Sequence, residues 1–309
     1  MFTERVLDTG KGRLHFRRET LTGLSCRISS ERSKRGIDQP TCLEFSHEGC
    51  PFCPGNLPAD TPVFSNGGRI IIGESITFPN LYPFAEWHTV TVITCDHRVP
   101  SFTRGQLVDA LAGQLESLRD HDGFPSINWN YLPSAGASLA HPHLQGLVDS
   151  VPPPLAARYF EGSERYLREQ GRNYWDDLRA AERAAGRVLV DREIFWYANP
   201  VPIGEKEIRG ILPVAHLSGL EPLIPCLAQD LLGMIAFYRS LGTHAFNFSL
   251  FFDREGCDRG FPAFCSLIAR INPSPISLSD SAFMERLHLE PVILTLPEDL
   301  SRMYREKMV

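Results

Sequence analysis

The feature that most constrains this chain is a pair of histidines separated by one proline, His141-Pro142-His143, followed by Gln145. The run before it, residues 124–132, is rich in β-branched and aromatic residues and predicts a strand. If the chain is extended at the histidines too, His141, His143 and Gln145 project to one face, because strand side chains alternate. Pro142 fixes its own φ and stiffens the backbone between the imidazoles. Three polar side chains on one face suit a reaction surface better than a hydrophobic core.

Length, composition and charge exclude several classes of protein. The 309 residues can form one large domain or two moderate ones, and 43% hydrophobic with 22% charged residues is typical of a globular protein. The net charge of -6 argues against a general role on nucleic acid or membrane surfaces. No apolar run approaches the roughly 18 residues of a spanning helix, and the start lacks a signal-peptide core. We therefore expect a cytoplasmic protein with no nucleic-acid or membrane partner.

Eight cysteines include one close pair, Cys50 and Cys53, in a Pro/Gly-rich turn. A disulfide framework is not expected in a long cytoplasmic chain. Two thiolates at this spacing can bind one tetrahedral metal ion, although the pair is also compatible with redox chemistry. His97 follows Cys53 by 44 residues and His141 follows His97 by 44, so these histidines would complete a Cys2His2 set. Taken alone, a histidine such as His97 is more often an ordinary surface or core residue than a metal ligand.

Two further segments each have a structural and a functional interpretation. The basic residues Arg32, Lys34 and Arg35 form either a solvated loop or an anion clamp, because a guanidinium group presents a fork of donors suited to phosphate. The segment 78–83 mixes aromatic residues with Asn80. It could hold a nucleotide base, or Asn80 could simply stabilise a turn.

The remaining pattern predicts two similar series of strands and helices. The first has two short strands within 12–35, strands at 69–72 and 87–94, an amphipathic helix at 103–120, and a long polar helical region at about 155–185. The second has strands at 187–191, 194–198 and 210–214, a helix at about 222–241, strands at 246–252 and 264–271, and a short helix at 296–306. This order indicates an internal duplication, in which the second series has no counterpart to the His-Pro-His run.

Together, these features resemble the galactose-1-phosphate uridylyltransferase family of the histidine-triad superfamily. The resemblance covers most of the chain, and the combination of the cysteine pair with the His-Pro-His-x-Gln run is specific. It rests on Leu21-Thr22-Gly23, the segment from Ile28 to Arg35, Cys50-Pro-Phe-Cys53-Pro-Gly-Asn56, Phe78-Pro-Asn80, Asp96-His97, Asn130, and Gly136-x-Ser138-x-x-His141-Pro-His143-x-Gln145.

The resemblance implies an α+β fold of two fused histidine-triad-like halves, each an antiparallel sheet flanked by helices, usually in a homodimer. We place the first half, with the zinc site and the histidine motif, at residues 1–185, and the second, without the catalytic motif, at residues 186–309. It further implies one structural Zn²⁺ per chain. The implied ligands are Cys50, Cys53, His97 and His141.

The resemblance also implies a reaction. His143 would attack the α-phosphorus of a nucleotide sugar and displace a sugar 1-phosphate, and a second sugar 1-phosphate would resolve the covalent nucleotidyl-histidine in a ping-pong cycle. Gln145 and Ser138 would donate to the phosphate oxygens. The residues implied to line the nucleotide and phosphate pocket are Arg32, Arg35, Asn80, Asn130, Ser138 and Gln145. We expect transfer of UMP by a UDP-glucose–hexose-1-phosphate uridylyltransferase-like enzyme of galactose metabolism.

Two segments depart from the family pattern. The late strand Phe264–Arg270 lacks the family's His-x-His, so we expect no second metal. Glu290 is a further expected substrate contact, but Leu289 stands where the family has an aromatic residue and Ala282 where it has a lysine. A nucleotide-sugar or dinucleotide phosphorylase or hydrolase that uses the same histidine is therefore one alternative. A non-catalytic nucleotide-binding protein is another.

Overall fold

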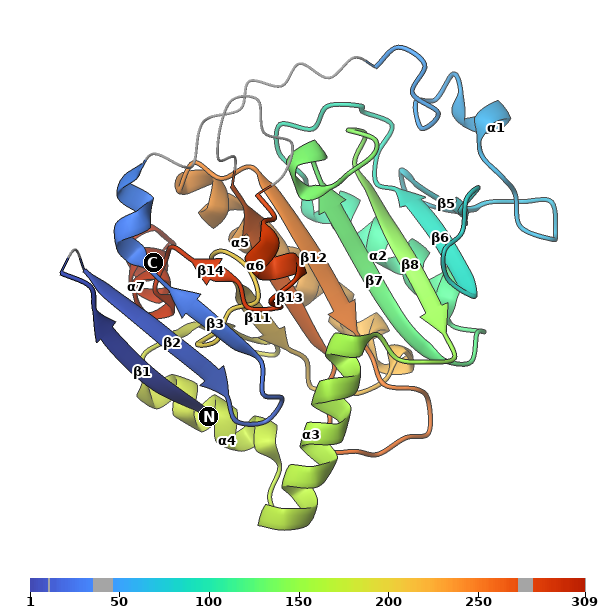
Figure 1. The fold of residues 1–309 in the computed structure, drawn as a ribbon. Coiled ribbons are helices and arrows are strands. Elements are labelled where there is room, and N and C mark those ends of the chain that lie inside the picture. The colour runs from blue at the N-terminus through green and yellow to red at the C-terminus, as the bar shows by residue number, and fades with distance from the viewer. Residues whose placement is uncertain (11, 36–46, 272–279, 309) are drawn as a thin grey trace.

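The computed structural model describes residues 1–10, 12–35, 47–271 and 280–308 (Figure 1). Its centre is a ten-stranded sheet in which every neighbouring pair of strands is antiparallel. The strands lie in the order β4 (Ile70–Ile72), β5 (Ser75–Pro79), β6 (Trp87–Val92), β8 (His143–Asp149), β7 (Phe124–Tyr131), β12 (Ala245–Phe251), β13 (Phe264–Arg270), β11 (Ile208–Ile211), β10 (Phe195–Ala198) and β9 (Val188–Asp191). The predicted α+β fold with antiparallel sheet is confirmed, and the sheets expected for the two halves are joined into one.

The sheet consists of two strand sets with the same internal order. The first set, β4–β8, lies in the order 4-5-6-8-7, and the second, β9–β13, lies in the order 9-10-11-13-12. In each set a long helix follows the third strand: α2 (Arg104–Leu118) in the first and α5 (Ile224–Ser240) in the second. The sets join where β7 pairs with β12, from Phe246 opposite Tyr131 to Phe251 opposite Ser126. The predicted boundary at 185/186 falls just before β9 and stays a prediction.

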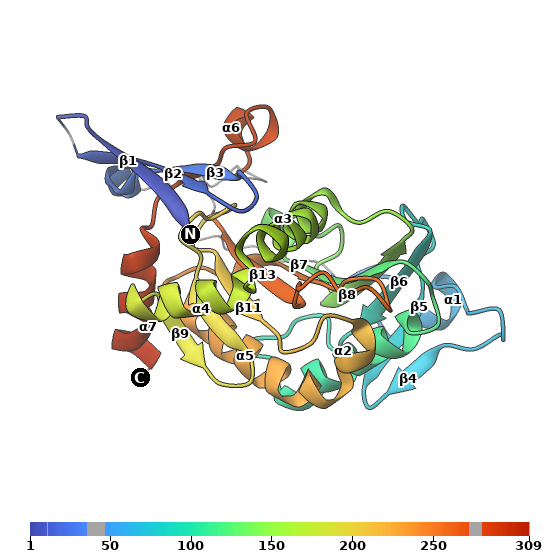
Figure 2. The same cartoon turned by 90° about the horizontal axis from the view of Figure 1, so that it is seen from below.

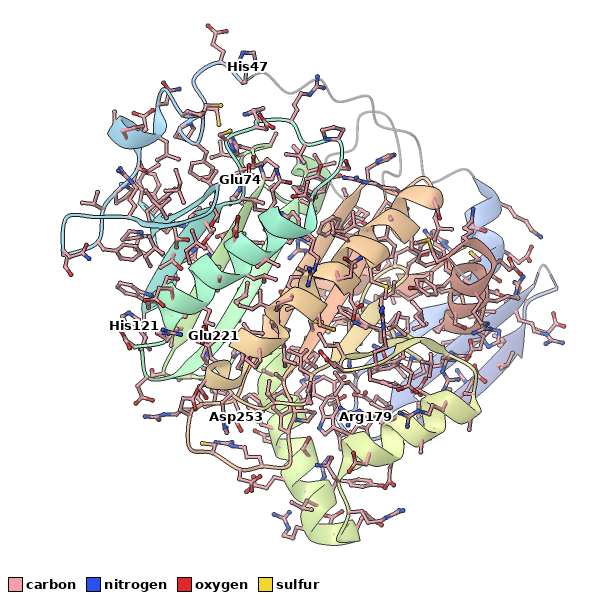
Figure 3. The ribbon with its side chains drawn as sticks, turned by 180° about the vertical axis from the view of Figure 1, so that it is seen from behind. His47, Glu74, His121, Arg179, Glu221 and Asp253 are labelled. Atoms are coloured by element: carbon pink, nitrogen blue, oxygen red, sulfur yellow. The ribbon has the colours of Figure 1, made fainter. Side chains whose placement is uncertain are left out.

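Helices cover both faces of this sheet. Seen from behind, α2 and α5 lie side by side across one face (Figure 3), and α7 (Pro297–Met308) packs on α5 beside them. Their apolar sides share one core with inward residues of the central strands, among them Trp129 and Phe246. The opposite face carries α3 (Pro154–Gln170) and α4 (Tyr174–Ala184), with a smaller sheet beside them (Figure 2). Among the described residues, no helix has the length and apolarity that a membrane crossing requires.

The smaller sheet joins the two ends of the chain. Its strands are β1 (Phe2–Asp8), β2 (Arg13–Glu19), β3 (Ser25–Ile28) and β14 (Val292–Ile293). The two strands predicted within 12–35 are β2 and β3, whereas β1, β5 and β14 were not predicted. The remaining short helices are η1 (Ser30–Arg35), α1 (Leu57–Asp60), η2 (Pro133–Ala135), η3 (Leu217–Gly219), η4 (Glu221–Leu223) and α6 (Phe283–Arg286).

The prediction of one long helical region at 155–185 was wrong in one respect. The segment forms two helices, because Gly171 adopts a left-handed conformation with φ 65° and ends α3. Asn173 then starts α4, since its side chain accepts a hydrogen bond from the backbone N–H of Trp175. This break turns α4 away from α3 and lets Trp175 pack under Phe261 and Phe264.

Candidate active site and metal cluster

The candidate site lies where β8 begins. His143 is the first residue of β8 and pairs with Val92, while Gln145 pairs with Val90. Both side chains therefore share one face of the sheet. The extended stretch predicted for residues 141–145 begins only at His143, so His141 precedes the strand. The ring of Phe52 packs edge-to-face against His143, with centroids 5.2 Å apart, and leaves His143 6% exposed.

The hydrogen bond at His143 defines which nitrogen can act as a nucleophile. Nδ1 lies 2.8 Å from the carbonyl oxygen of His141. A carbonyl oxygen only accepts, so Nδ1 carries the hydrogen and Nε2 keeps its lone pair. Burial lowers the pKa of His143, which favours the neutral ring at pH 7. The site thus presents a neutral imidazole with a fixed tautomer and an available Nε2.

Beside His143 lies a cluster of four potential metal ligands, Cys50, Cys53, His97 and His141, whose ligand atoms are all within 4.8 Å of one another. Cys50 Sγ is 3.7 Å from His141 Nδ1, and Cys53 Sγ is 3.6 Å from His97 Nδ1 and 3.7 Å from His141 Nδ1. Around a tetrahedral zinc, bond lengths of about 2.3 Å to sulfur and 2.1 Å to nitrogen give S···N separations of about 3.6 Å. The cluster therefore has the dimensions of a zinc site and could hold one metal ion.

The protonation of these four groups also fits a metal. His141 Nε2 lies 2.8 Å from the carbonyl oxygen of Thr94, so its lone pair is on Nδ1, which faces the sulfurs. Burial lowers the pKa of both His97 and His141. Burial, with a smaller contribution from Cys50, raises the pKa of Cys53, so the Cys53 thiol resists ionisation unless a cation lies beside its sulfur.

No protein-family model matches the sequence. An uncharacterised protein of Archaeoglobus fulgidus is 25% identical over 275 residues, which cover 85% of this chain and 83% of the relative.

Solved structures share the whole architecture. An ADP-glucose phosphorylase from Arabidopsis thaliana, solved with bound ADP-glucose, has a TM-score of 0.75 at 18% identity and covers 95% of this chain and 99% of its own. A GalT-like protein from A. thaliana has a TM-score of 0.74 at 17% identity, with coverages of 94% and 98%. A uridylyltransferase has a TM-score of 0.70 at 17% identity, with coverages of 95% and 99%. The chain has a uridylyltransferase-like fold.

Within this uridylyltransferase-like fold, three of the predicted pocket residues lie on or next to the face that carries His143. Gln145 is two residues further along β8, and its Oε1 is 3.0 Å from His88 Nε2. Asn80 follows β5, and its Nδ2 is 3.0 Å from the same His88 nitrogen. Asn130 is in β7, where its Oδ1 accepts a hydrogen bond of 2.6 Å from Asn247.

The other predicted site residues lie in other elements. Ser138 is exposed in the loop between η2 and β8, and Arg32 is exposed in η1 beyond the smaller sheet. The side chain of Arg35 lies outside the described residues. Glu290 forms an ion pair of 2.9 Å with Arg27 of β3. Their predicted contacts with substrate stay predictions.

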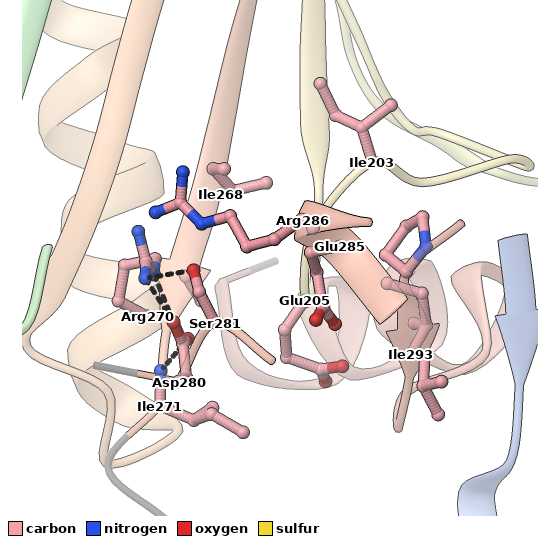
Figure 4. A pocket seen from close by; sticks show the side chains of 14 residues that line it. Ile203, Glu205, Ile268, Arg270, Ile271, Asp280, Ser281, Glu285, Arg286 and Ile293 are labelled. Atoms are coloured by element: carbon pink, nitrogen blue, oxygen red, sulfur yellow. Dashed lines mark hydrogen bonds and ion pairs between the residues drawn. The ribbon is translucent and has the colours of Figure 1, made fainter. Parts of the chain in front are cut away.

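The second strand set extends the polar face of the site, which the sequence motifs did not indicate. Asn247 donates to Asn130, and Arg270 donates to Asn247 Oδ1 over 2.7 Å. Arg270 also pairs with Asp280 at the wall of a cavity of about 290 Å³ between β13, β14 and α6 (Figure 4). A line of polar side chains thus runs from β7 to this cavity. Sequence patterns could locate it only once the register between β7 and β12 is known.

Proposed function

We propose that this chain is a nucleotidyltransferase that moves a nucleoside monophosphate, as UMP in our expectation, between a nucleotide sugar and a sugar 1-phosphate. The observation that carries the proposal is the hydrogen bond from His143 Nδ1 to the His141 carbonyl, which leaves Nε2 as a neutral nucleophile. Gln145 on the same face supplies a donor for the phosphate oxygens. The likeness in fold to a uridylyltransferase and to a phosphorylase solved with ADP-glucose supports the same class of substrate.

The proposed reaction balances as two displacements. The Nε2 lone pair of His143 forms a bond to the α-phosphorus, the bond from that phosphorus to the bridging oxygen breaks, and sugar 1-phosphate leaves. Positive charge develops on the ring, and Nδ1–H continues to donate to the His141 carbonyl, which stabilises it. A phosphate oxygen of the acceptor then attacks the same phosphorus, and the N–P bond breaks.

The cluster of Cys50, Cys53, His97 and His141 is proposed to hold one structural zinc. A bound ion would fix the backbone at His141 and so preserve the carbonyl that orients His143. We also propose that the enzyme is a homodimer, in keeping with the family it resembles.

The test of the proposal is direct. The protein is incubated with a nucleotide sugar radiolabelled in the α-phosphate, separated from free nucleotide and treated with acid. The wild type should carry acid-labile label on His143, and His143→Ala should carry none. His244→Ala is the matched control, because His244 is an exposed histidine outside the site. Absence of label from the wild type, or label that survives in His143→Ala, contradicts the mechanism.

A phosphorylase is the second candidate, and the bound ADP-glucose of the phosphorylase neighbour favours it. It shares the first displacement and differs only in the acceptor, which is inorganic phosphate. The labelled enzyme is therefore isolated and offered phosphate or hexose 1-phosphate separately. Release of nucleoside diphosphate with phosphate alone identifies a phosphorylase, and release of nucleotide sugar with hexose 1-phosphate identifies the transferase. A protein that binds nucleotide without ever becoming labelled is non-catalytic.

A further inference from the structure

His88 is a buried side chain that contacts Gln145 and has no role in the reaction proposed above. It lies on β6 opposite Leu147, so it is diagonal to Gln145 on the same face of the sheet. The residue is 4% exposed, and its ring packs edge-to-face against Phe84, with centroids 4.3 Å apart. Its Nε2 lies 3.0 Å from Gln145 Oε1. The ring thus lies between the loop after β5 and the side chain of Gln145 and contacts both.

The backbone N–H of Phe84 favours one tautomer of His88. The backbone N–H of Phe84 points at Nδ1 from 3.4 Å, and a backbone N–H only donates. Nδ1 therefore accepts, and Nε2 carries the hydrogen that it donates to Gln145 Oε1. The other tautomer would set two N–H groups against each other at Nδ1. Burial lowers the pKa of His88, which favours the neutral ring that this arrangement needs.

Asn80 reaches the same ring with a defined orientation. The backbone N–H of Tyr82 donates to Asn80 Oδ1 over 2.9 Å, so the amide nitrogen of Asn80 faces His88. That nitrogen is 3.4 Å from Nδ1 and 3.0 Å from Nε2. If Nε2 held the lone pair, Asn80 would donate there and Gln145 would have to turn its own amide nitrogen to the ring. The two tautomers therefore demand opposite orientations of the Gln145 amide. The Nε2–H form provides an acceptor at Nδ1 for Phe84 and, at 3.4 Å, for Asn80, whose shorter contact with Nε2 is then not a hydrogen bond.

We propose that His88 is a positioning residue that holds Gln145 Oε1 and thereby directs both N–H groups of the Gln145 amide toward the α-phosphate. This inference deepens the proposed function and rests on it for the identity of the ligand. An unrestrained glutamine presents either end of its amide at similar cost, and its oxygen would repel a phosphate. Fixing the donor end before substrate binds is the preorganisation that charge stabilisation requires.

The kinetic test compares two substitutions at His88. His88→Leu removes the donor, and we expect the rate constant for labelling His143 to fall about 10- to 100-fold while the dissociation constant of the nucleotide sugar is unchanged. His88→Gln should restore most of the rate, because its amide nitrogen can donate from near the position of Nε2. In a Gln145→Ala background, His88→Leu should cause no further loss, since His88 acts through Gln145. The proposal would be overturned if the rate losses from Gln145→Ala and His88→Leu multiplied in the double variant. Equal labelling rates for His88→Leu and His88→Gln would overturn it as well.

A second measurement needs neither substrate nor turnover. In ¹⁵N spectra of the metal-loaded wild type, His88 should show the neutral Nε2–H tautomer, and the side-chain amide resonances of Gln145 should move in His88→Leu. An Nδ1–H tautomer, or unmoved Gln145 resonances in a folded variant, overturns the inference. If the wild type never becomes labelled, the proposed function fails, and these spectra still decide whether His88 orients Gln145.

Discussion

His143 Nδ1 lies 2.8 Å from the carbonyl oxygen of His141, the residue whose own Nδ1 faces the sulfurs of Cys50 and Cys53. One backbone carbonyl therefore connects the metal cluster to the candidate nucleophile. Whatever fixes the backbone at His141 also fixes the tautomer and orientation of the His143 ring. Loss of the cluster should consequently affect both folding and the reactivity of His143.

The first prediction concerns this cluster. Wild-type protein should contain about one zinc per chain, because the four donors match a tetrahedral ion. Cys53→Ser should lose the metal and lower the free energy of unfolding by about 3 kcal/mol or more, as expected when a structural metal is lost. Metal analysis and denaturant unfolding measure both effects. Cys95→Ser is the control, because Cys95 is an exposed cysteine outside the cluster. Equal zinc content and equal stability in Cys53→Ser and Cys95→Ser would contradict a metal site at this cluster.

The second prediction concerns Gly146 of β8. A side chain at this position would point away from the site and toward α2. A Cβ at this position would collide with Gln114 Oε1 and lie 2.8 Å from Thr89 Oγ1. Gly146→Ala should therefore push α2 from β8 and destabilise the fold by about 1–3 kcal/mol. The comparison is Gly233→Ala in α5, where nothing lies within 4 Å of an added Cβ and the helix should gain up to about 1 kcal/mol. Thermal unfolding of both variants tests the prediction, and equal shifts would refute it.

The third prediction concerns a buried ion pair between the end of α4 and the start of β9. Arg187 donates to both carboxylate oxygens of Glu182, over 2.6 and 2.9 Å, and its Nη1 reaches Glu298 of α7. The Glu182 side chain is fully buried. Arg187→Met would leave that carboxylate without its partner and should cost about 3–5 kcal/mol.

The matched double variant tells whether the pair or the packing matters. Adding Glu182→Gln to Arg187→Met removes the buried charge, and most of the lost stability should return. Urea unfolding of the wild type, both single variants and the double variant gives the coupling. A double variant as unstable as Arg187→Met would show that shape, not charge, causes the loss.

The fourth prediction concerns the pH dependence of stability. Burial raises the pKa of Asp230, which accepts hydrogen bonds from Trp196 Nε1 and Arg192. A carboxyl group whose pKa is higher in the folded state binds protons more tightly there, so its contribution is present at low pH and is lost as pH rises through that raised pKa. As the pH rises from 4 to 8, the free energy of unfolding of the wild type should therefore fall relative to that of Asp230→Asn. A constant difference across this range would contradict the shift.

Local patterns predicted those parts of the molecule that local physics decides. The alternation of polar residues at the start of β8 placed His143 and Gln145 on one face, and strand or helix periodicity located most of the ten-stranded sheet and its long helices. Gly171 was an overlooked local signal, because a glycine in a polar helical stretch often ends the helix.

Non-local pairing explains what the sequence did not reveal. The strand β14 exists only because Val292 pairs in parallel with Arg27, which is far away in the chain. His88 belongs to the site only through the register between β6 and β8, which brings its ring to Gln145. Neither contact can be recognised from the sequence periodicity of the segments that form it.

A comparison of the two strand sets limits the number of nucleotidyl groups that one chain can carry. In the first set the last residue of β6, Val92, pairs with His143; in the second, the last residue of β11, Ile211, pairs with Phe264. An aromatic ring that cannot attack phosphorus thus occupies the corresponding place, and Tyr159 of α3 packs on it with centroids 5.0 Å apart. However long the incubation, covalent labelling should therefore saturate at a single equivalent per polypeptide.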